Sequence, residues 1–171
     1  MEQLIQKCKQ NNPKAQNELY TTFAATMLGM CERYTHTKEE AEEVLMNGFV
    51  KVFSNLEQYK ALGSFEGWMR KIFIREALNY NKKFKLKLVR LSLLEVDGLE
   101  TNSDYGEGEY LLNKLKKLPK GYKTVFNLFA IEGYKHKEIA VLLNITENTS
   151  KTQYRKAKMM LQNLCKDEYR R

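Results

Sequence analysis

The chain has 171 residues, of which 43% are hydrophobic and 29% are charged, with two prolines, three cysteines and two histidines. This length fits one domain or two small ones, and the hydrophobic content excludes a disordered or collagen-like chain. The apolar runs are far shorter than the roughly 20 residues that a membrane-spanning helix needs, and we expect no secretory signal. Because the cysteines and histidines are few and scattered, we expect no disulfide framework, no metal site and no cofactor, in a protein of the reducing cytoplasm.

The net charge of +8 is concentrated in the last third of the chain. Residues 1–80 contain ten basic and ten acidic side chains, and residues 81–110 contain five and six. Residues 111–171 contain fourteen basic and only five acidic side chains. Such an excess indicates either a surface that binds a polyanion or helix faces that are simply solvated.

The first eighty residues show the apolar periodicity of helices throughout. Apolar residues recur three and four positions apart, and this pattern predicts three or four packed helices; they include Leu19, Phe23, Met27, Met30, Val44, Leu45, Phe49, Val52, Trp68, Ile72, Phe73 and Ala77. Thr37 and Glu40 have the spacing of a capping box. Gly63 and Ser64 interrupt the pattern, and we expect Ser64 to cap the helix that contains Trp68.

The middle of the chain lacks a sustained period. Residues 81–90 are basic, whereas residues 91–107 are acidic and contain turn-forming glycines. We interpret residues 91–107 as a flexible acidic linker. It joins a helical domain over residues 1–90 to a second helical domain over residues 108–171, and the predicted fold is therefore all-α with two small domains.

The second domain contains the spacing of a helix-turn-helix over residues 133–152. Asn144 stands where a left-handed backbone is needed, and Asn tolerates that conformation second only to Gly. Thr146 is expected to cap a long helix whose first turns face base edges in the major groove. Lys151, Arg155 and Lys158 share one face of that helix. The alternative is a plain helical hairpin with a basic solvent face.

Three blocks of the sequence, residues 39–53, 63–72 and 118–161, together with the helical start, resemble the extracytoplasmic function (ECF) sigma factors of the sigma-70 family. The resemblance spans nearly the whole chain. It implies a dissociable RNA polymerase subunit that recognises promoters and promotes strand opening, and that is not an enzyme. The implied partners are core RNA polymerase, double-stranded promoter DNA, the melted non-template strand and an anti-sigma factor, with no small-molecule substrate. An anti-sigma factor in the inner membrane would hold such a cytoplasmic protein there.

The first block resembles the helix that docks on core RNA polymerase. The resemblance assigns this contact to Glu43, Met46, Asn47 and Phe49. The family usually has a Gln–acid pair where Met46 and Asn47 stand, so a charge-assisted contact is lost here. We therefore expect docking to depend more on the apolar side chains of Met46 and Phe49. The acidic run over residues 39–43 has a second interpretation, the solvated start of a helix.

The second block resembles the element that reads and opens the −10 promoter sequence, with a specificity loop over residues 59–65. Holding a base outside the stack requires aromatic stacking and a polar pocket. The residues implied in contacts with the −10 strand are Tyr59, Phe65, Trp68, Arg70, Lys71 and Arg75. The family often has Asn at the position of Arg75. Phe65 and Trp68 are also spaced as ordinary core aromatics would be, and that alternative remains.

The third block resembles the domain that reads the −35 element. The residues implied in that contact are Asn148, Thr149, Lys151, Thr152, Arg155 and Lys156. Ser150 stands where the family often has Val, and Lys135 where it often has a capping Ser.

Two other classes of protein remain open at this stage. A helix-turn-helix regulator that does not bind polymerase would explain residues 111–171 but not the first two blocks. A helical adaptor would explain the helices and would have no affinity for DNA.

Overall fold

The computed structural model describes residues 1–91 and 107–166, with side chains for residues 1–83 and 110–166. These residues form helices joined by turns, and no strand occurs among them. The chain divides into two compact units, Met1–Glu100 and Thr101–Arg171. The predicted all-α fold with two small domains is confirmed, whereas the predicted linker falls mostly on residues 92–106, outside the described residues.

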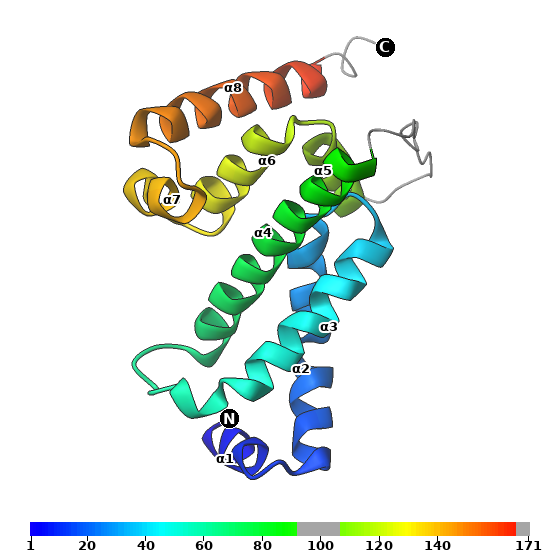
Figure 1. Cartoon of the computed structure of the whole chain (residues 1–171), viewed down its shortest axis with the longest axis vertical. Coiled ribbons are helices and arrows are strands. Elements are labelled where there is room, and N and C mark those ends of the chain that lie inside the picture. Colours follow the sequence, from blue (N-terminus) through cyan, green and yellow to red (C-terminus); the bar gives the residue numbers. More distant parts are fainter. Residues whose placement is uncertain (92–106, 167–171) are drawn as a thin grey trace. The chain divides into compact units, whose positions relative to one another are not determined.

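The first unit is a bundle of four helices and one short 3-10 helix (Figure 1). Its core consists of three helices that pack on one another, with the first helix lying on the second and against the 3-10 helix. In chain order the elements are α1 (Glu2–Lys9), α2 (Pro13–Glu32), α3 (Lys38–Ser54), η1 (Leu56–Gln58) and α4 (Phe65–Leu91). The expectation of three or four packed helices is confirmed, and α4 also includes the basic residues 81–90.

Short polar side chains begin the helices of the first unit. The Asn12 side chain accepts hydrogen bonds from the backbone N–H groups of Lys14 and Ala15 at the start of α2. Thr37 Oγ1 accepts from the Glu40 N–H at 3.2 Å, as predicted. The Glu40 carboxylate accepts from the His36 N–H rather than from Thr37, so only half of the capping box forms as expected.

The second unit contains four helices and one turn of π-helix. Its elements are α5 (Glu107–Lys116), α6 (Lys120–Phe126), η2 (Asn127–Ile131), α7 (His136–Leu143) and α8 (Glu147–Lys166). Buried side chains of α5, of the turn that follows it and of α8 form one core cluster, with partly buried side chains of α6 and α8 against it; the cluster comprises Leu115, Leu118, Ala157 and Leu161, packed against Tyr122, Phe126 and Met160. Pro119 precedes α6, where its missing N–H costs nothing.

No helix among the described residues has both the length and the apolar composition that a membrane crossing requires.

The packing of α3 on α4 depends on the absence of a side chain at Gly48. A Cβ atom at Gly48 would lie on the ring of Phe73 of α4, which is fully buried. The neighbouring Phe49 meets the same ring edge-on, with 5.2 Å between centroids. Lys51 forms an ion pair with the buried Glu76, also across these two helices. The contacts between the two helices thus include the close approach of Gly48 to Phe73, the Phe49–Phe73 ring pair and the Lys51–Glu76 ion pair.

We predict that Gly48→Ala lowers the free energy of unfolding of the first unit by about 1–3 kcal/mol, the usual cost of overfilling a packed core. Gly29→Ala in α2 is the matched control, because a Cβ atom there meets nothing within 4 Å. It should raise stability by about 0.4–1 kcal/mol, since alanine lowers the conformational entropy of the unfolded chain. Urea denaturation followed by circular dichroism measures both changes. Equal effects at the two glycines would contradict the role of Gly48.

Candidate nucleic-acid and polymerase interfaces

The turn between α7 and α8 has the geometry of a helix-turn-helix. Asn144 adopts a left-handed backbone with φ 54° and ψ 52°, as predicted. The Ile145 N–H donates to the Ala140 carbonyl at 3.0 Å and closes the end of α7. Thr146 Oγ1 accepts from the Thr149 N–H at 3.0 Å and begins α8. Local sequence therefore sets the angle at which α8 leaves the turn.

Aromatic side chains from three elements hold α8 in place. Phe129 of η2 stacks on His136 of α7 at 4.2 Å and contacts Tyr154 of α8 at 4.6 Å. Nδ1 of His136 lies 2.9 Å from Oγ of Ser150, which is fully buried. The Ser150 hydroxyl, at a position where the family often has Val, thus has a polar partner. A hydrogen bond joins α7 and α8 there instead of an aliphatic contact.

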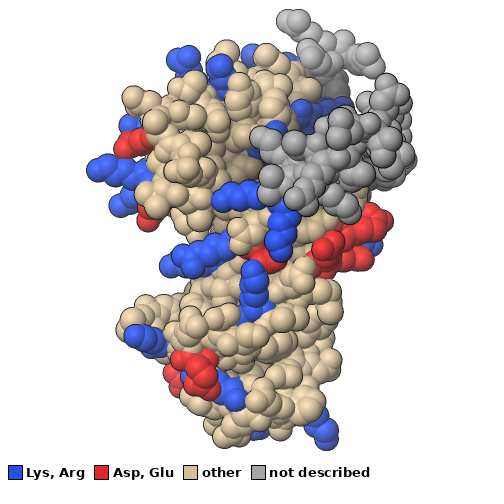
Figure 2. Space-filling view, in the orientation of Figure 1, with Lys and Arg blue, Asp and Glu red and all other residues tan. Residues whose placement is uncertain are grey.

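The residues predicted to read the −35 element lie in the first three turns of α8. Asn148, Lys151, Thr152, Arg155 and Lys156 are exposed, whereas Thr149 is half-buried and its hydroxyl lies 2.8 Å from Thr146 Oγ1. Figure 2 shows Lys and Arg side chains outnumbering acidic ones over the region where Figure 1 places α7 and α8.

One acidic side chain interrupts this basic face of α8. The Glu147 carboxylate lies 2.6 Å from the Lys151 ammonium. This hydrogen bond, helped by the positive charges nearby, holds the pKa of Glu147 below its usual value. In the free protein Lys151 therefore already has a carboxylate partner.

In the first unit, a pocket of about 450 Å³ lies between η1 and the start of α4. Three of the predicted −10 residues line it, namely Tyr59, Trp68 and Lys71. Gln58 and Ser64 line it as well; the sequence alone did not assign them to the −10 contact, although Gln58 directly precedes the predicted specificity loop and Ser64 lies within it. Ser64 Oγ also accepts from the Gly67 N–H at 3.1 Å, which confirms its predicted role as the cap of α4.

The other three predicted −10 residues, Phe65, Arg70 and Arg75, are not among the side chains that line this pocket. Arg70 is half-buried and lies 3.5 Å from Glu66, one turn earlier on α4. Arg75 is exposed further along the same helix.

Two aromatic rings, those of Tyr59 and Trp68, line this pocket, and the ring of Phe65 packs against both. The Tyr59, Phe65 and Trp68 rings lie 5.1–5.5 Å apart. Phe65 is only 5% exposed and meets Phe23 of α2 edge-on, so it belongs to the core and supports the other two rings. Trp68 is half-buried and can present a ring face to the pocket. The Tyr59 hydroxyl donates to the Gly63 carbonyl at 2.8 Å and closes the loop.

The predicted polymerase face of α3 is partly different from what the sequence indicated. Glu43, Met46 and Asn47 are exposed, with Met46 56% exposed. Phe49 is only 3% exposed and packs against Tyr20 at 4.7 Å, so the expected surface contact through Phe49 is wrong. Val50, 61% exposed and one turn from Met46, is the second apolar side chain on this face. Its spacing from Glu43 and Met46 was the signal that could have identified it.

Glu43 is held in place from α4. The Tyr80 phenol hydrogen-bonds to the Glu43 carboxylate. Burial, together with the negative charges of Glu40 and Glu43, raises the pKa of Tyr80 to about 12. The phenol therefore stays protonated at neutral pH, and its O–H donates a hydrogen bond to the Glu43 carboxylate.

Comparison with known proteins finds a family match for each of the two units. The model of sigma-70 region 2 matches residues 19–85, and that of sigma-70 region 4 matches residues 108–161. The ECF RNA polymerase sigma-E factor of Haemophilus influenzae is 23% identical, over 94% of this chain and 92% of the relative. The RNA polymerase sigma factor SigV of Bacillus subtilis is 28% identical, over 79% of this chain and 82% of the relative.

A solved structure shares the fold. The sigma factor RpoE from Bartonella quintana, in complex with the anti-sigma factor NepR, aligns with a TM-score of 0.63 at 14% identity. The alignment covers 88% of this chain and 96% of that chain.

Fold and sites together define an all-helical protein with a helix-turn-helix unit and a second unit that carries an aromatic pocket. The two matched regions are parts of a single family and together span more than half of the chain. The chain belongs to the sigma-70 family of RNA polymerase sigma factors, in its ECF branch. Its function is that of a sigma factor, which directs core RNA polymerase to promoters. A helix-turn-helix regulator without polymerase is not favoured, because it leaves residues 19–85 unexplained.

We predict that the left-handed turn makes Asn144→Ala less stable than Asn144→Gly by about 1 kcal/mol, because a Cβ without a local polar partner is strained in this conformation. Thermal unfolding of the two variants, followed by circular dichroism, measures the difference. A higher stability of Asn144→Ala than of Asn144→Gly would show that residue 144 can leave the left-handed conformation at little cost in free energy.

Proposed function

We propose that the two units divide the work of promoter recognition between named surfaces. The first unit docks on core RNA polymerase through α3 and holds the opened −10 element in the pocket beside Trp68. The second unit reads the −35 element through the first turns of α8. The observation that carries this proposal is the pocket of about 450 Å³ beside the half-buried Trp68. Such a pocket can receive an unpaired base, and only an opened strand of DNA presents one.

Opening of the −10 element follows from the chemistry of this pocket. Taking a base out of the stack costs a few kcal/mol, which stacking on an aromatic ring and polar contacts must offset. Trp68 and Tyr59 supply the rings, and Gln58 and Ser64 supply hydrogen-bonding groups. Lys71 supplies a cation for the phosphates of the non-template strand.

Reading of the −35 element rests on exposed side chains of α8. Arg155 is the residue best suited to a bidentate contact with a guanine, and Asn148 can contact an adenine or a phosphate. Lys156 and Lys151 add charge toward the DNA backbone, and Lys151 must first leave Glu147. The Thr149 hydroxyl is already hydrogen-bonded to that of Thr146, so Thr149 shapes the start of α8 and contacts the DNA backbone.

Docking on polymerase combines one carboxylate with two apolar side chains. Tyr80 orients Glu43 for a charge-assisted contact. Met46 and Val50 supply exposed apolar area that a partner can cover.

The chain acts without catalysis and without a cofactor of its own, in the cytoplasm where core polymerase works. Among the described residues, no cluster of three or more His, Cys, Asp or Glu side chains could hold a metal ion. Burial raises the pKa of the Cys31 thiol to about 12, which makes it a poor nucleophile. An anti-sigma factor is the expected regulator, since the relative from Bartonella quintana was solved with one.

Transcription in vitro tests this function directly. Core RNA polymerase, a library of promoters and the full chain should yield transcripts from a small set of sequences. No transcript should appear from that set without the chain. If the chain binds DNA but neither binds core polymerase nor starts transcripts, it is an ordinary groove-binding regulator.

Arg155→Ala should weaken binding to the selected −35 element by about 1–3 kcal/mol and relax its sequence preference at one position, because one base contact is lost. Lys166→Ala, at the far end of α8, is the control for loss of a positive charge and should leave preference unchanged. Competition binding with a panel of −35 variants measures both. A uniform loss on all sequences would make Arg155 a phosphate contact.

Trp68→Ala should leave the closed complex intact and impair strand opening, because the ring that stacks on the unpaired base is removed. Permanganate reactivity of unpaired thymines measures opening, and gel shift at low temperature measures the closed complex. Trp68→Tyr keeps a ring and should retain most of the opening. Full opening by Trp68→Ala would return this side chain to a purely structural role.

A further inference from the structure

A second hollow lies between α1 and the predicted specificity loop over residues 59–65, here called the −10 loop. Its volume is about 630 Å³, within the range of about 300–1,000 Å³ that small-molecule sites occupy. Tyr59 lines both this hollow and the pocket beside Trp68. We refer to the cavity between the −10 loop and α1 as the α1 hollow. The part of its lining that comes from α1 precedes the segment matched by the family model, since α1 ends at Lys9 and the match begins at residue 19.

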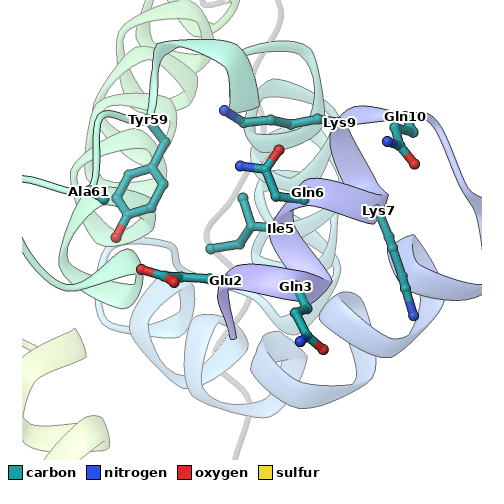
Figure 3. A pocket seen from close by; sticks show the side chains of 9 residues that line it. All are labelled: Glu2, Gln3, Ile5, Gln6, Lys7, Lys9, Gln10, Tyr59 and Ala61. Carbon is teal, nitrogen blue, oxygen red and sulfur yellow. The ribbon is translucent and has the colours of Figure 1, made fainter.

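Most of the side chains that line the α1 hollow are polar and come from α1, whereas Tyr59 and Ala61 come from the loop over residues 59–65. Figure 3 shows Glu2, Gln6 and Lys9 reaching from α1 toward Tyr59, while Lys7 turns away. Ile5 is buried and forms an apolar part of the lining. The Lys9 ammonium lies 3.7 Å from Glu57 of η1, which ties α1 to the loop.

These groups match the needs of an unpaired base better than those of a phosphate. The Glu2 carboxylate repels an anion but accepts hydrogen bonds from amino and ring N–H groups of a base. The Gln6 amide can donate to a ring carbonyl, and Tyr59 offers an aromatic ring for stacking. Lys9, once it leaves Glu57, can hold the phosphate that follows the base. Guanine is the base whose pairing edge presents a carbonyl beside two adjacent donors.

We propose that the α1 hollow receives an unpaired guanine of the non-template strand, adjacent to the base held beside Trp68. This rests on the proposed function, because only an opened strand exposes that edge. Tyr59 lines both the pocket beside Trp68 and the α1 hollow, so a strand whose base lies beside Trp68 can continue past Tyr59 to the α1 hollow. The loop between the two sites is fixed by the Tyr59–Gly63 hydrogen bond and by Ala61, whose φ is 55°. The α1 helix thus adds sequence choice beyond the −10 pocket.

The test uses holoenzyme, assembled from the full chain and core polymerase, on a promoter selected in the transcription experiment. The template carries a pre-opened bubble whose non-template strand has guanine or hypoxanthine at each position flanking the captured base. Hypoxanthine lacks only the exocyclic amino group. At one flanking position it should bind about five- to hundredfold more weakly than guanine, the range of one good base contact.

Variants then assign the effect to the α1 hollow. In Glu2→Gln the difference between guanine and hypoxanthine should shrink to less than twofold, whereas in Glu18→Gln, a matched loss of charge on α2, it should persist. Glu2 and Glu18 are both exposed, so neither change removes core packing. The proposal is overturned if no flanking position distinguishes the two bases, or if Glu2→Gln leaves the difference unchanged.

Two further outcomes distinguish a failure of this proposal from a failure of the proposed function. Absence of transcription from every promoter rejects the proposed function itself, whereas normal transcription without a preference for guanine rejects only the α1 hollow as a base site. A titration of the full chain with free guanosine monophosphate identifies the other source of the same chemistry. Binding of the free nucleotide that depends on Glu2, with no effect of the strand base, overturns the proposal in favour of a mononucleotide site.

Discussion

The close approach of α3 to α4 at Gly48 determines what the first unit can present on its surface. The backbone of α3 at Gly48 leaves room for the ring of Phe73, and the next residue, Phe49, packs inward on both Phe73 and Tyr20. Met46 and Val50 are then left on the opposite side of α3. The same helix pair brings Tyr80 against Glu43, so one packing contact governs both the apolar and the charged parts of the proposed polymerase face.

Aromatic side chains connect the core of the first unit to its nucleic-acid site. Phe23 supports Phe65, and Phe65 supports the rings of Tyr59 and Trp68. A pocket built on this support is already shaped before a base arrives, which reduces the ordering cost of holding one. Tyr59 stands between the Trp68 pocket and the α1 hollow, so a strand can be held on both sides of a single ring.

In the second unit, packing contacts fix the orientation of α8, the helix proposed to enter a DNA groove. Phe129, His136 and Tyr154 tie α8 to the elements before it, and Ser150 adds a buried hydrogen bond. The exposed face of α8 is left for polar and basic side chains, as sequence-specific contact in a groove requires. Glu147 lowers the positive potential of this face in the free protein by pairing with Lys151.

Local chemistry in the sequence determined the helices, the cap at Ser64 and the left-handed turn at Asn144, because each depends on neighbours within a few residues. The arrangement of exposed residues along α8 was predictable for the same reason. Only the tertiary structure decided that Phe49 and Phe65 are buried, and that Val50 is exposed. Periodicity marks an apolar side chain without saying which partner covers it. The hollow between α1 and the −10 loop likewise joins segments some fifty residues apart, a distance over which spacing in the sequence carries no information.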